Sequence, residues 1–115
     1  MPSMTTYNPG DILLVPFPFT DQTSAKQRPA VVLSSAPYNR NHSDVILAPI
    51  TSKINRTTDE VIVSKWQSAG LIKASAVKPI LASFETSLVR RQLGALTQPD
   101  LQATRDLFRR ILALD

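Results

Sequence analysis

The 115-residue chain contains no cysteine and only one histidine, His42. Without cysteine it can form no disulfide and no thiolate metal site, and it has no thiol nucleophile. A single histidine excludes a multi-histidine metal cluster and an acid–base pair of two histidines. We therefore expect no metal ion and no other cofactor. The lack of cysteine also fits a reducing compartment, and we expect the protein to be cytoplasmic.

Long apolar segments are also missing. No apolar run approaches the roughly 20 residues that a membrane-spanning helix requires, and the start, MPSMTTYNPG, lacks the regions of a secretory signal. We find no internal repeat, linker or low-complexity tract. The length and the 43% hydrophobic content predict a single globular domain, 1–115, without membrane contact.

Positive charge exceeds negative charge, with 13 Lys and Arg against 9 Asp and Glu and a formal net charge of +4. Such an excess suits a polyanionic partner, because phosphates attract Lys and Arg irrespective of sequence. Many small proteins are equally basic without binding nucleic acid, so charge is weak support taken alone.

The most informative segment is GDILLVPFPFTDQTSAKQRPAVVLS, residues 10–34. Two apolar segments of β type, Ile12–Phe17 and Ala30–Leu33, flank a polar loop. Pro29 lacks an amide N–H and suits the first residue of a strand, and it biases Arg28 toward an extended backbone. The guanidinium is thus expected where a loop meets a rigid strand, which is a suitable place to bind phosphate in a fixed geometry.

The rest of the chain predicts short strands followed by one helix. The expected strands are Ile12–Phe17, Arg28–Ser35, Asp44–Ile50, Thr58–Ser64, Leu71–Val77 and Ile80–Phe84. Pro16 and Pro18 place the first strand near an edge or a bend. We expect Ala36–Ser43 to be a connector and Lys65–Gly70 a helical turn, whereas Ser87–Leu96 is open between a turn and a last strand.

The C-terminal segment has the pattern of an amphipathic helix capped by Thr97, with Asp100 in its first turn. The expected buried stripe is Leu101, Thr104, Phe108, Ile111 and Leu112, with arginines on the opposite side. Short strands followed by a terminal helix favour a small, partly open antiparallel barrel over a sheet of alternating strands and helices.

The residues available for chemistry are Arg, Lys, Thr, Ser and a few carboxylates. This set suits RNA cleavage, because RNA supplies its own nucleophile, the 2′-hydroxyl, and the protein need only align it and stabilise the charged phosphorane. Arg28 is the best phosphate clamp, although a surface arginine over apolar neighbours explains it equally well. The Thr51 hydroxyl either binds a phosphate oxygen or satisfies a turn, and Lys53 either adds positive charge or is merely solvated.

The polar loop before Arg28 offers two further candidates. Asp21 either accepts a proton or makes a local turn. Phe19 either stacks on unpaired bases or anchors the loop, whereas we expect Phe17 to belong to the core.

The chain resembles the MazF/PemK family, the toxin halves of bacterial toxin–antitoxin pairs. The resemblance rests on GDILLVPFPFTD, KQRPAVVLS, VILAPITSK, GLIKASAVKP and SLVRRQLGALT, and it covers nearly the whole chain in the family's order. It implies an SH3-like barrel with a C-terminal helix, a homodimer, and metal-independent endoribonuclease cleavage of single-stranded RNA at short sequences. The implied products carry 2′,3′-cyclic phosphate and 5′-hydroxyl ends. The implied partner is an antitoxin whose acidic C-terminal tail occupies the RNA groove.

The resemblance also implies site residues. The family's active-site arginine falls on Arg28 and its threonine on Thr51, and its RNA-contacting loop falls on Pro18–Gln27. The implied RNA-binding residues are Phe19, Thr20, Asp21, Lys26, Gln27, Ser52, Lys53 and Lys78. Some members carry a carboxylate general base in the stretch that corresponds to 75–81, but this chain has no acid there, so the general base and the general acid stay unassigned.

Two alternatives use the same scaffold. One is a CcdB-like poison of gyrase, whose function depends on C-terminal residues including a tryptophan, whereas this chain ends ILALD without an aromatic residue. The other is a nucleic-acid-binding module without catalysis, because a fold does not settle a function. The leading hypothesis is an mRNA-cleaving toxin.

Overall fold

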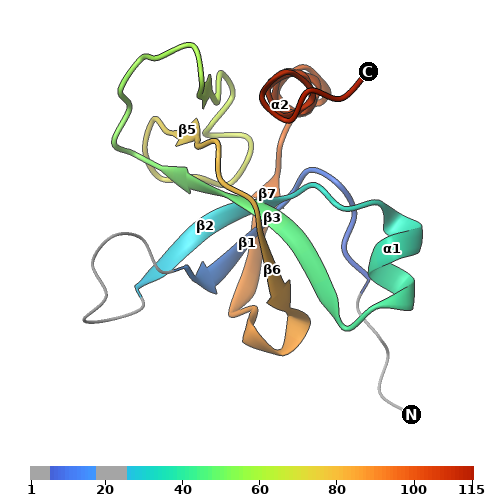
Figure 1. Cartoon of the computed structure of the whole chain (residues 1–115). Helices are drawn as coiled ribbons and strands as arrows, with labels where there is room; N and C mark the ends of the chain where they lie inside the picture. Colours follow the sequence, from blue (N-terminus) through green and yellow to red (C-terminus); the bar gives the residue numbers. More distant parts are fainter. Residues whose placement is uncertain (1–5, 18–25) are drawn as a thin grey trace.

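A computed structural model describes residues 6–17 and 26–115. It shows a mainly antiparallel sheet followed by a C-terminal helix, as the order of elements predicts (Figure 1). The strands are β1 Asp11–Pro16, β2 Gln27–Val32, β3 Asp44–Thr51, β4 Val61–Ile62, β5 Ala76–Val77, β6 Ala82–Glu85 and β7 Arg91–Ala95. The helices are α1 Ala36–Asn41, the 3-10 turn η1 Thr86–Leu88 and α2 Gln98–Ile111. Among these described helices, none has the length and apolar character needed to cross a membrane.

Strand β3 is the centre of the sheet. Along the path β4-β5-β3-β2-β1-β7 it pairs with β2 on one side, and on the other it pairs with β6 along its first half and β5 at its end. All of these pairs are antiparallel. The arrangement brings the ends of β2, β3 and β5 together at one corner of the sheet.

The central strands are buried on both faces, which explains their nearly continuous apolar sequences. One face, together with α2, forms a core of Ile12, Val31, Ala48, Ile50, Val63, Ala69, Leu71, Val77, Leu96, Leu101, Leu107 and Phe108. The opposite face forms a second core of Leu13, Val15, Phe17, Ala30, Val32, Val45 and Leu47. Adjacent residues of a strand therefore point into different cores.

Helix α2 begins as expected, since the Thr97 hydroxyl oxygen accepts the N–H of Asp100 at 3.5 Å. The Asp100 carboxylate does more than favour the first turn. It accepts from the Ser64 hydroxyl at 2.8 Å and from the Lys65 N–H at 3.1 Å, so it joins α2 to the turn that follows β4. The expected helical turn over 65–70 is present, and Gly70 ends it at φ +91°.

One expectation about the elements is wrong. The connector at 36–43 contains α1, because the Ser35 hydroxyl caps it and Pro37 fits its first turn. Strand β1 lies near an edge of the sheet, as expected, between β2 and the last strand of the path, β7. Its pairing with β7 stops at Leu14, so Pro16 leaves no gap in that ladder.

The far end of the buried stripe on α2 also differs from expectation. Leu101, Thr104 and Phe108 are buried, but Ile111 and Leu112 are 37% and 48% exposed, because the helix runs past the edge of the sheet. The two strands expected at 58–64 and 71–77 are much shorter, as β4 and β5. The ambiguous stretch 87–96 contains most of η1 as well as β7.

Candidate functional site

The register between β2 and β3 brings Arg28 and Thr51 together. Ala30 lies opposite Pro49, and continuing the same antiparallel register by two residues places Arg28 opposite Thr51. Residues opposite one another in an antiparallel pair share a face of the sheet. Both side chains are half-buried, and both line the same two adjoining clefts.

The two clefts lie on either side of this pair. The smaller has a volume of about 220 Å³ and is lined by Gln27, Arg28, Pro29, Ile50, Thr51, Ser52, Leu71, Ile72, Lys73 and Ser75. The larger has a volume of about 440 Å³ and is lined by Arg28, Thr51, Lys53, Asn55, Lys78, Pro79 and Ile80. We call the two together the β2–β3 cleft. Its polar lining includes four cations, at Arg28, Lys53, Lys73 and Lys78, which suits a phosphodiester chain.

The Thr51 hydroxyl performs one of the two roles weighed from the sequence, because it closes a turn. Its oxygen accepts the backbone N–H of Lys53 at 3.2 Å, directly after β3. A hydroxyl has one donor and two acceptor positions. The turn occupies one acceptor position and does not use the O–H.

Lys78 contributes to the cleft in a more constrained way than the sequence suggests. Its ammonium Nζ lies 2.5 Å from Oε1 of Glu60, and only 13% of the Lys78 side chain and 2% of the Glu60 side chain are exposed. Burial raises the pKa of Glu60, but the hydrogen bond from Lys78, two backbone hydrogen bonds and the positive charge of Lys78 outweigh it, so the pKa lies below its ordinary value. The Glu60 carboxyl group is therefore ionised at neutral pH.

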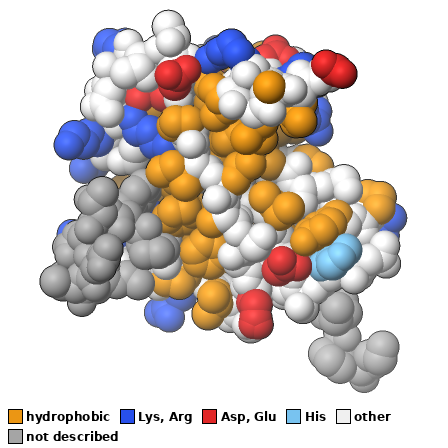
Figure 2. Space-filling model, viewed as in Figure 1, with side chains coloured by type: hydrophobic (Ala, Val, Ile, Leu, Met, Phe, Trp, Pro, Cys, Tyr) orange, Lys and Arg blue, Asp and Glu red, His pale blue; other side chains and the backbone are white. Residues whose placement is uncertain are grey.

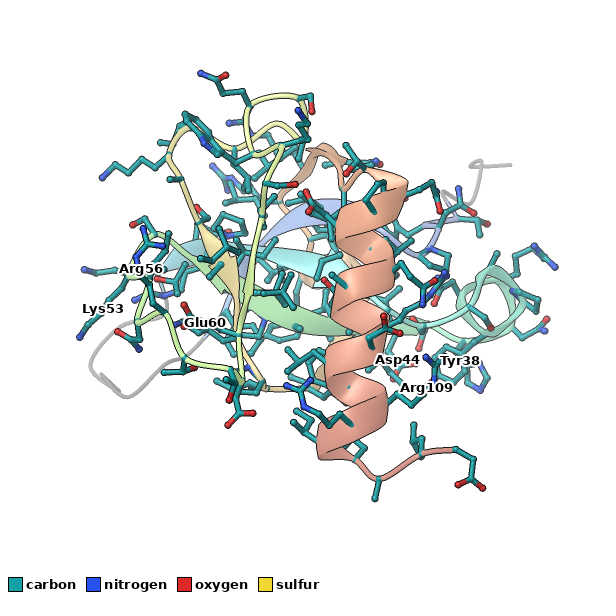
Figure 3. The ribbon with its side chains drawn as sticks, turned by 90° about the horizontal axis from the view of Figure 1, so that it is seen from above. Tyr38, Asp44, Lys53, Arg56, Glu60 and Arg109 are labelled. Carbon is teal, nitrogen blue, oxygen red and sulfur yellow. The ribbon has the colours of Figure 1, made fainter. Side chains whose placement is uncertain are left out.

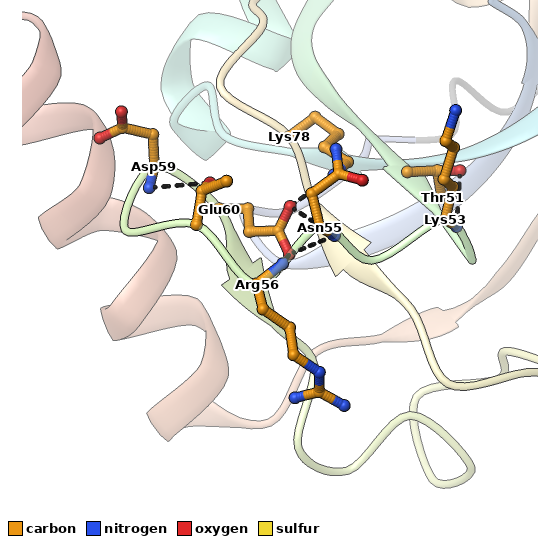
Figure 4. Close-up of polar contacts among 8 residues, drawn as sticks. Thr51, Lys53, Asn55, Arg56, Asp59, Glu60 and Lys78 are labelled. Atoms are coloured by element: carbon orange, nitrogen blue, oxygen red, sulfur yellow. Dashed lines mark hydrogen bonds and ion pairs between the residues drawn. The ribbon is translucent and has the colours of Figure 1, made fainter.

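The same carboxylate also shapes the loop after β3. Glu60 accepts the N–H of Asn55 at 3.1 Å and the N–H of Arg56 at 2.8 Å (Figure 4). From above, Lys53, Arg56 and Glu60 lie together on one side of α2, with Tyr38 and Asp44 on the other (Figure 3). The loop and the cleft thus share one corner of the molecule.

The remaining predicted site residues fall into two groups. Gln27, Ser52 and Lys53 are exposed residues that line the cleft at the ends of β2 and β3, and the exposed Lys26 directly precedes β2. Phe19, Thr20 and Asp21 lie outside the described residues. Phe17 belongs to the core, as expected, and its ring centroid lies 5.4 Å from that of Phe84.

Sequence reasoning missed Asn55, Lys73 and Glu60. The signal for Glu60 was an acid within the strand expected over 58–64, since a charged residue that is buried requires a partner. No comparable signal marks Asn55, because its place in the cleft depends on the path of the loop. Within residues 6–17 and 26–115, no group of three or more His, Asp or Glu side chains is arranged to hold a metal ion.

Family comparisons agree with this architecture. A family model described as "PemK-like, MazF-like toxin of type II toxin-antitoxin system" matches residues 8–112. The chain therefore belongs to the PemK/MazF family of toxins, as its motifs predict. No curated protein sequence matches the chain significantly.

Solved structures show the same fold. The Mycobacterium tuberculosis toxin MazF-mt6 is 23% identical with a TM-score of 0.77, and the match covers 91% of this chain and 98% of that one. MazF from Deinococcus radiodurans is 24% identical with a TM-score of 0.78, covering 96% and 99%. A mycobacterial structure described as an endoribonuclease in complex with its cognate antitoxin is 17% identical with a TM-score of 0.78, covering 97% and 98%. The likeness extends over essentially the whole of each chain.

Proposed function

We propose that this protein is a metal-independent endoribonuclease toxin that cleaves single-stranded RNA at short sequences. The observation that carries the proposal is that a guanidinium and a hydroxyl, Arg28 and Thr51, line one open cleft with further cations around it. Membership of the PemK/MazF family supports it, as does the endoribonuclease named among the similar structures.

In the proposed reaction the 2′-oxygen of RNA attacks the neighbouring phosphorus. The O–H proton passes to a base, the bond from phosphorus to the 5′-oxygen breaks, and the leaving oxygen takes up a proton. The products are a 2′,3′-cyclic phosphate and a 5′-hydroxyl. Arg28 stabilises the charge of the phosphorane, and Thr51 donates a hydrogen bond to a phosphate oxygen. A guanidinium stays protonated in proteins, so Arg28 acts as a cation and not as the base.

The RNA path is proposed to follow the polar residues around the cleft. Lys53 and Lys26 supply positive charge, and Gln27 and Ser52 supply hydrogen-bonding groups at the ends of their strands. Lys78, Phe19, Thr20 and Asp21 are proposed to complete the RNA-binding set. Contacts of this kind position the phosphate over Arg28 and read the bases on either side.

We also propose a cognate antitoxin as partner, with an acidic C-terminal tail that occupies the β2–β3 cleft in place of RNA. The net charge of +4 and the cations of the cleft suit such a tail. A similar mycobacterial protein and MazF of Deinococcus radiodurans have been solved with an antitoxin.

A homodimer is the third proposal. Figure 2 shows hydrophobic side chains gathered on the face that carries β3, β6 and the C-terminal end of α2. A groove of about 320 Å³ on the molecule is lined by Leu33, Ser34, Ile46, Leu81, Arg105, Phe108, Arg109, Leu112 and Leu114. Exposed leucines in one groove suit a second copy of the chain. Light scattering after size exclusion should give twice the 12.7 kDa mass of one chain.

The test of the enzyme is incubation of the purified protein with a long RNA in excess chelator, followed by primer extension. The proposal predicts cuts at a recurring short sequence. Binding without cutting would instead indicate a non-catalytic module, and inhibition of gyrase in a supercoiling assay without cutting would indicate a gyrase poison.

A further inference from the structure

We propose that Glu60 is a positioning residue for the β2–β3 cleft, whose carboxylate fixes the Lys78 ammonium and the turn at Asn55–Arg56 in one wall. The inference rests on the proposed function. It assigns a role to a residue that does not line the cleft itself, and it explains why a nearly buried carboxylate stands beside a site built to bind an anion.

The strand register places the pair at the cleft. Val61 lies opposite Val77, so Glu60 and Lys78 occupy the next opposed positions, directly before β4 and directly after β5. The Lys78 N–H donates to the carbonyl of Pro49 at 3.0 Å, so this lysine continues the sheet beside β3, two residues from Thr51. This backbone hydrogen bond holds the residue beside β3, and the ion pair with Glu60 holds its ammonium.

The loop depends on the same carboxylate. Arg56 has φ +56°, a left-handed conformation that is strained for a residue with a side chain. The hydrogen bond from its N–H to Glu60 offsets that strain, and in Figure 4 the Arg56 side chain points away from the carboxylate. On the far side, the Arg110 guanidinium donates to the carbonyl of Thr58 at 2.6 Å, so both ends of the turn are held. Asn55 and Lys53 are therefore presented to the cleft by a fixed backbone.

The electrostatics separate this role from simple RNA attraction. Glu60 cancels the charge of Lys78, so removing its charge makes the cleft more positive. If the carboxylate only weakened attraction for RNA, its loss would improve binding without harming cleavage. If it positions the wall, its loss lowers the rate of the chemical step even though binding holds or improves.

The experiment compares Glu60→Gln with wild type and with Glu85→Gln. Glu85 is exposed and lies opposite Asp44 at the start of β3, whereas Thr51 ends that strand at the cleft, so the control removes the same charge far from the site. The readouts are kcat and KM for a short labelled RNA containing a mapped cut site, the salt dependence of KM, and thermal unfolding of each variant. We expect Glu60→Gln to lower kcat about tenfold or more, with KM unchanged or lower and more dependent on salt.

Lys78→Met and the double variant test whether Glu60 acts through its partner. The double variant should lose less kcat than the product of the two single losses, because the two groups form one unit. A kcat for Glu60→Gln equal to that of Glu85→Gln would overturn the inference while leaving the nuclease intact. Losses that simply multiply, or that vanish once rates are corrected for unfolded protein, would also overturn it. No cleavage by the wild type would overturn the proposed function and this inference together.

Discussion

Replacing Arg28 with alanine is the most informative change to the proposed site. The guanidinium belongs to the wall shared by both parts of the β2–β3 cleft, so its loss removes a cation that lines both parts together with Thr51. The backbone of Arg28 pairs with Val15 across β1 and β2, and alanine keeps that pairing. Because the side chain is only half-buried, we expect the variant to fold.

The size of the loss follows from what the group does. Removing one preorganised donor that stabilises transition-state charge lowers kcat by about 10²–10³, equivalent to about 2.7–4 kcal/mol. Binding should weaken less, since one lost phosphate contact lowers the salt slope of single-stranded binding by about 0.7. Arg28→Lys should recover only part of the rate, because an ammonium keeps the charge but loses the two-pronged guanidinium.

The assay is single-turnover cleavage of an end-labelled RNA with enzyme in excess, in the presence of chelator. Circular dichroism and thermal unfolding of each variant provide the check on folding. A folded Arg28→Ala protein that cleaves at the wild-type rate would refute the assignment of Arg28 and, with it, the mechanism.

Three further changes test other parts of the account. Thr51→Val should lower the single-turnover rate roughly tenfold, since it removes one hydrogen-bond donor worth about 1.4 kcal/mol; an unchanged rate would show that the hydroxyl only closes the turn. Folding lowers the pKa of Glu60 below its ordinary value of 4.5. The ionised carboxylate therefore stabilises the folded protein fully above pH 4.5, and this stabilisation is lost as the pH falls through the lowered pKa. The free energy of unfolding, measured with urea, should therefore fall more steeply in acid for the wild type than for Glu60→Gln. Parallel pH profiles of the two proteins would contradict this. Asp100→Ala should lower the free energy of unfolding by about 2 kcal/mol, because it removes the acceptor of the Lys65 N–H and of the Ser64 hydroxyl. The folded variant should cleave RNA at the wild-type rate.

Local signals predicted the parts of the fold that are local in origin. The Thr97 cap, the turn that ends at Gly70 and the strands around Pro29 follow from residue chemistry over a few positions. The prolines also indicated that β1 lies near an edge, but no local signal reveals its pairing with β7, which stops at Leu14. The lengths of β4 and β5 were overestimated for a similar reason, since how far each strand extends depends on pairing partners far along the chain.

The candidate site shows the same division. Arg28 and Thr51 carry recognisable local patterns, and the pairing of β2 with β3 brings them together across more than twenty residues of sequence. No local pattern predicts the Glu60–Lys78 pair, because only the register of β4 against β5 brings the two residues together. Lys78, which the family resemblance marks as an RNA contact, is also held by a nearly buried acid.

The most direct test of the central claim uses a short RNA with a mapped cut site, made in two forms that differ only by a 2′-deoxy substitution at the nucleotide that supplies the nucleophile. The account predicts cleavage of the all-ribose RNA in chelator, with 2′,3′-cyclic phosphate and 5′-hydroxyl ends, and no cleavage at the substituted position. Cutting at the deoxy position, or products with 3′-hydroxyl and 5′-phosphate ends, would contradict it.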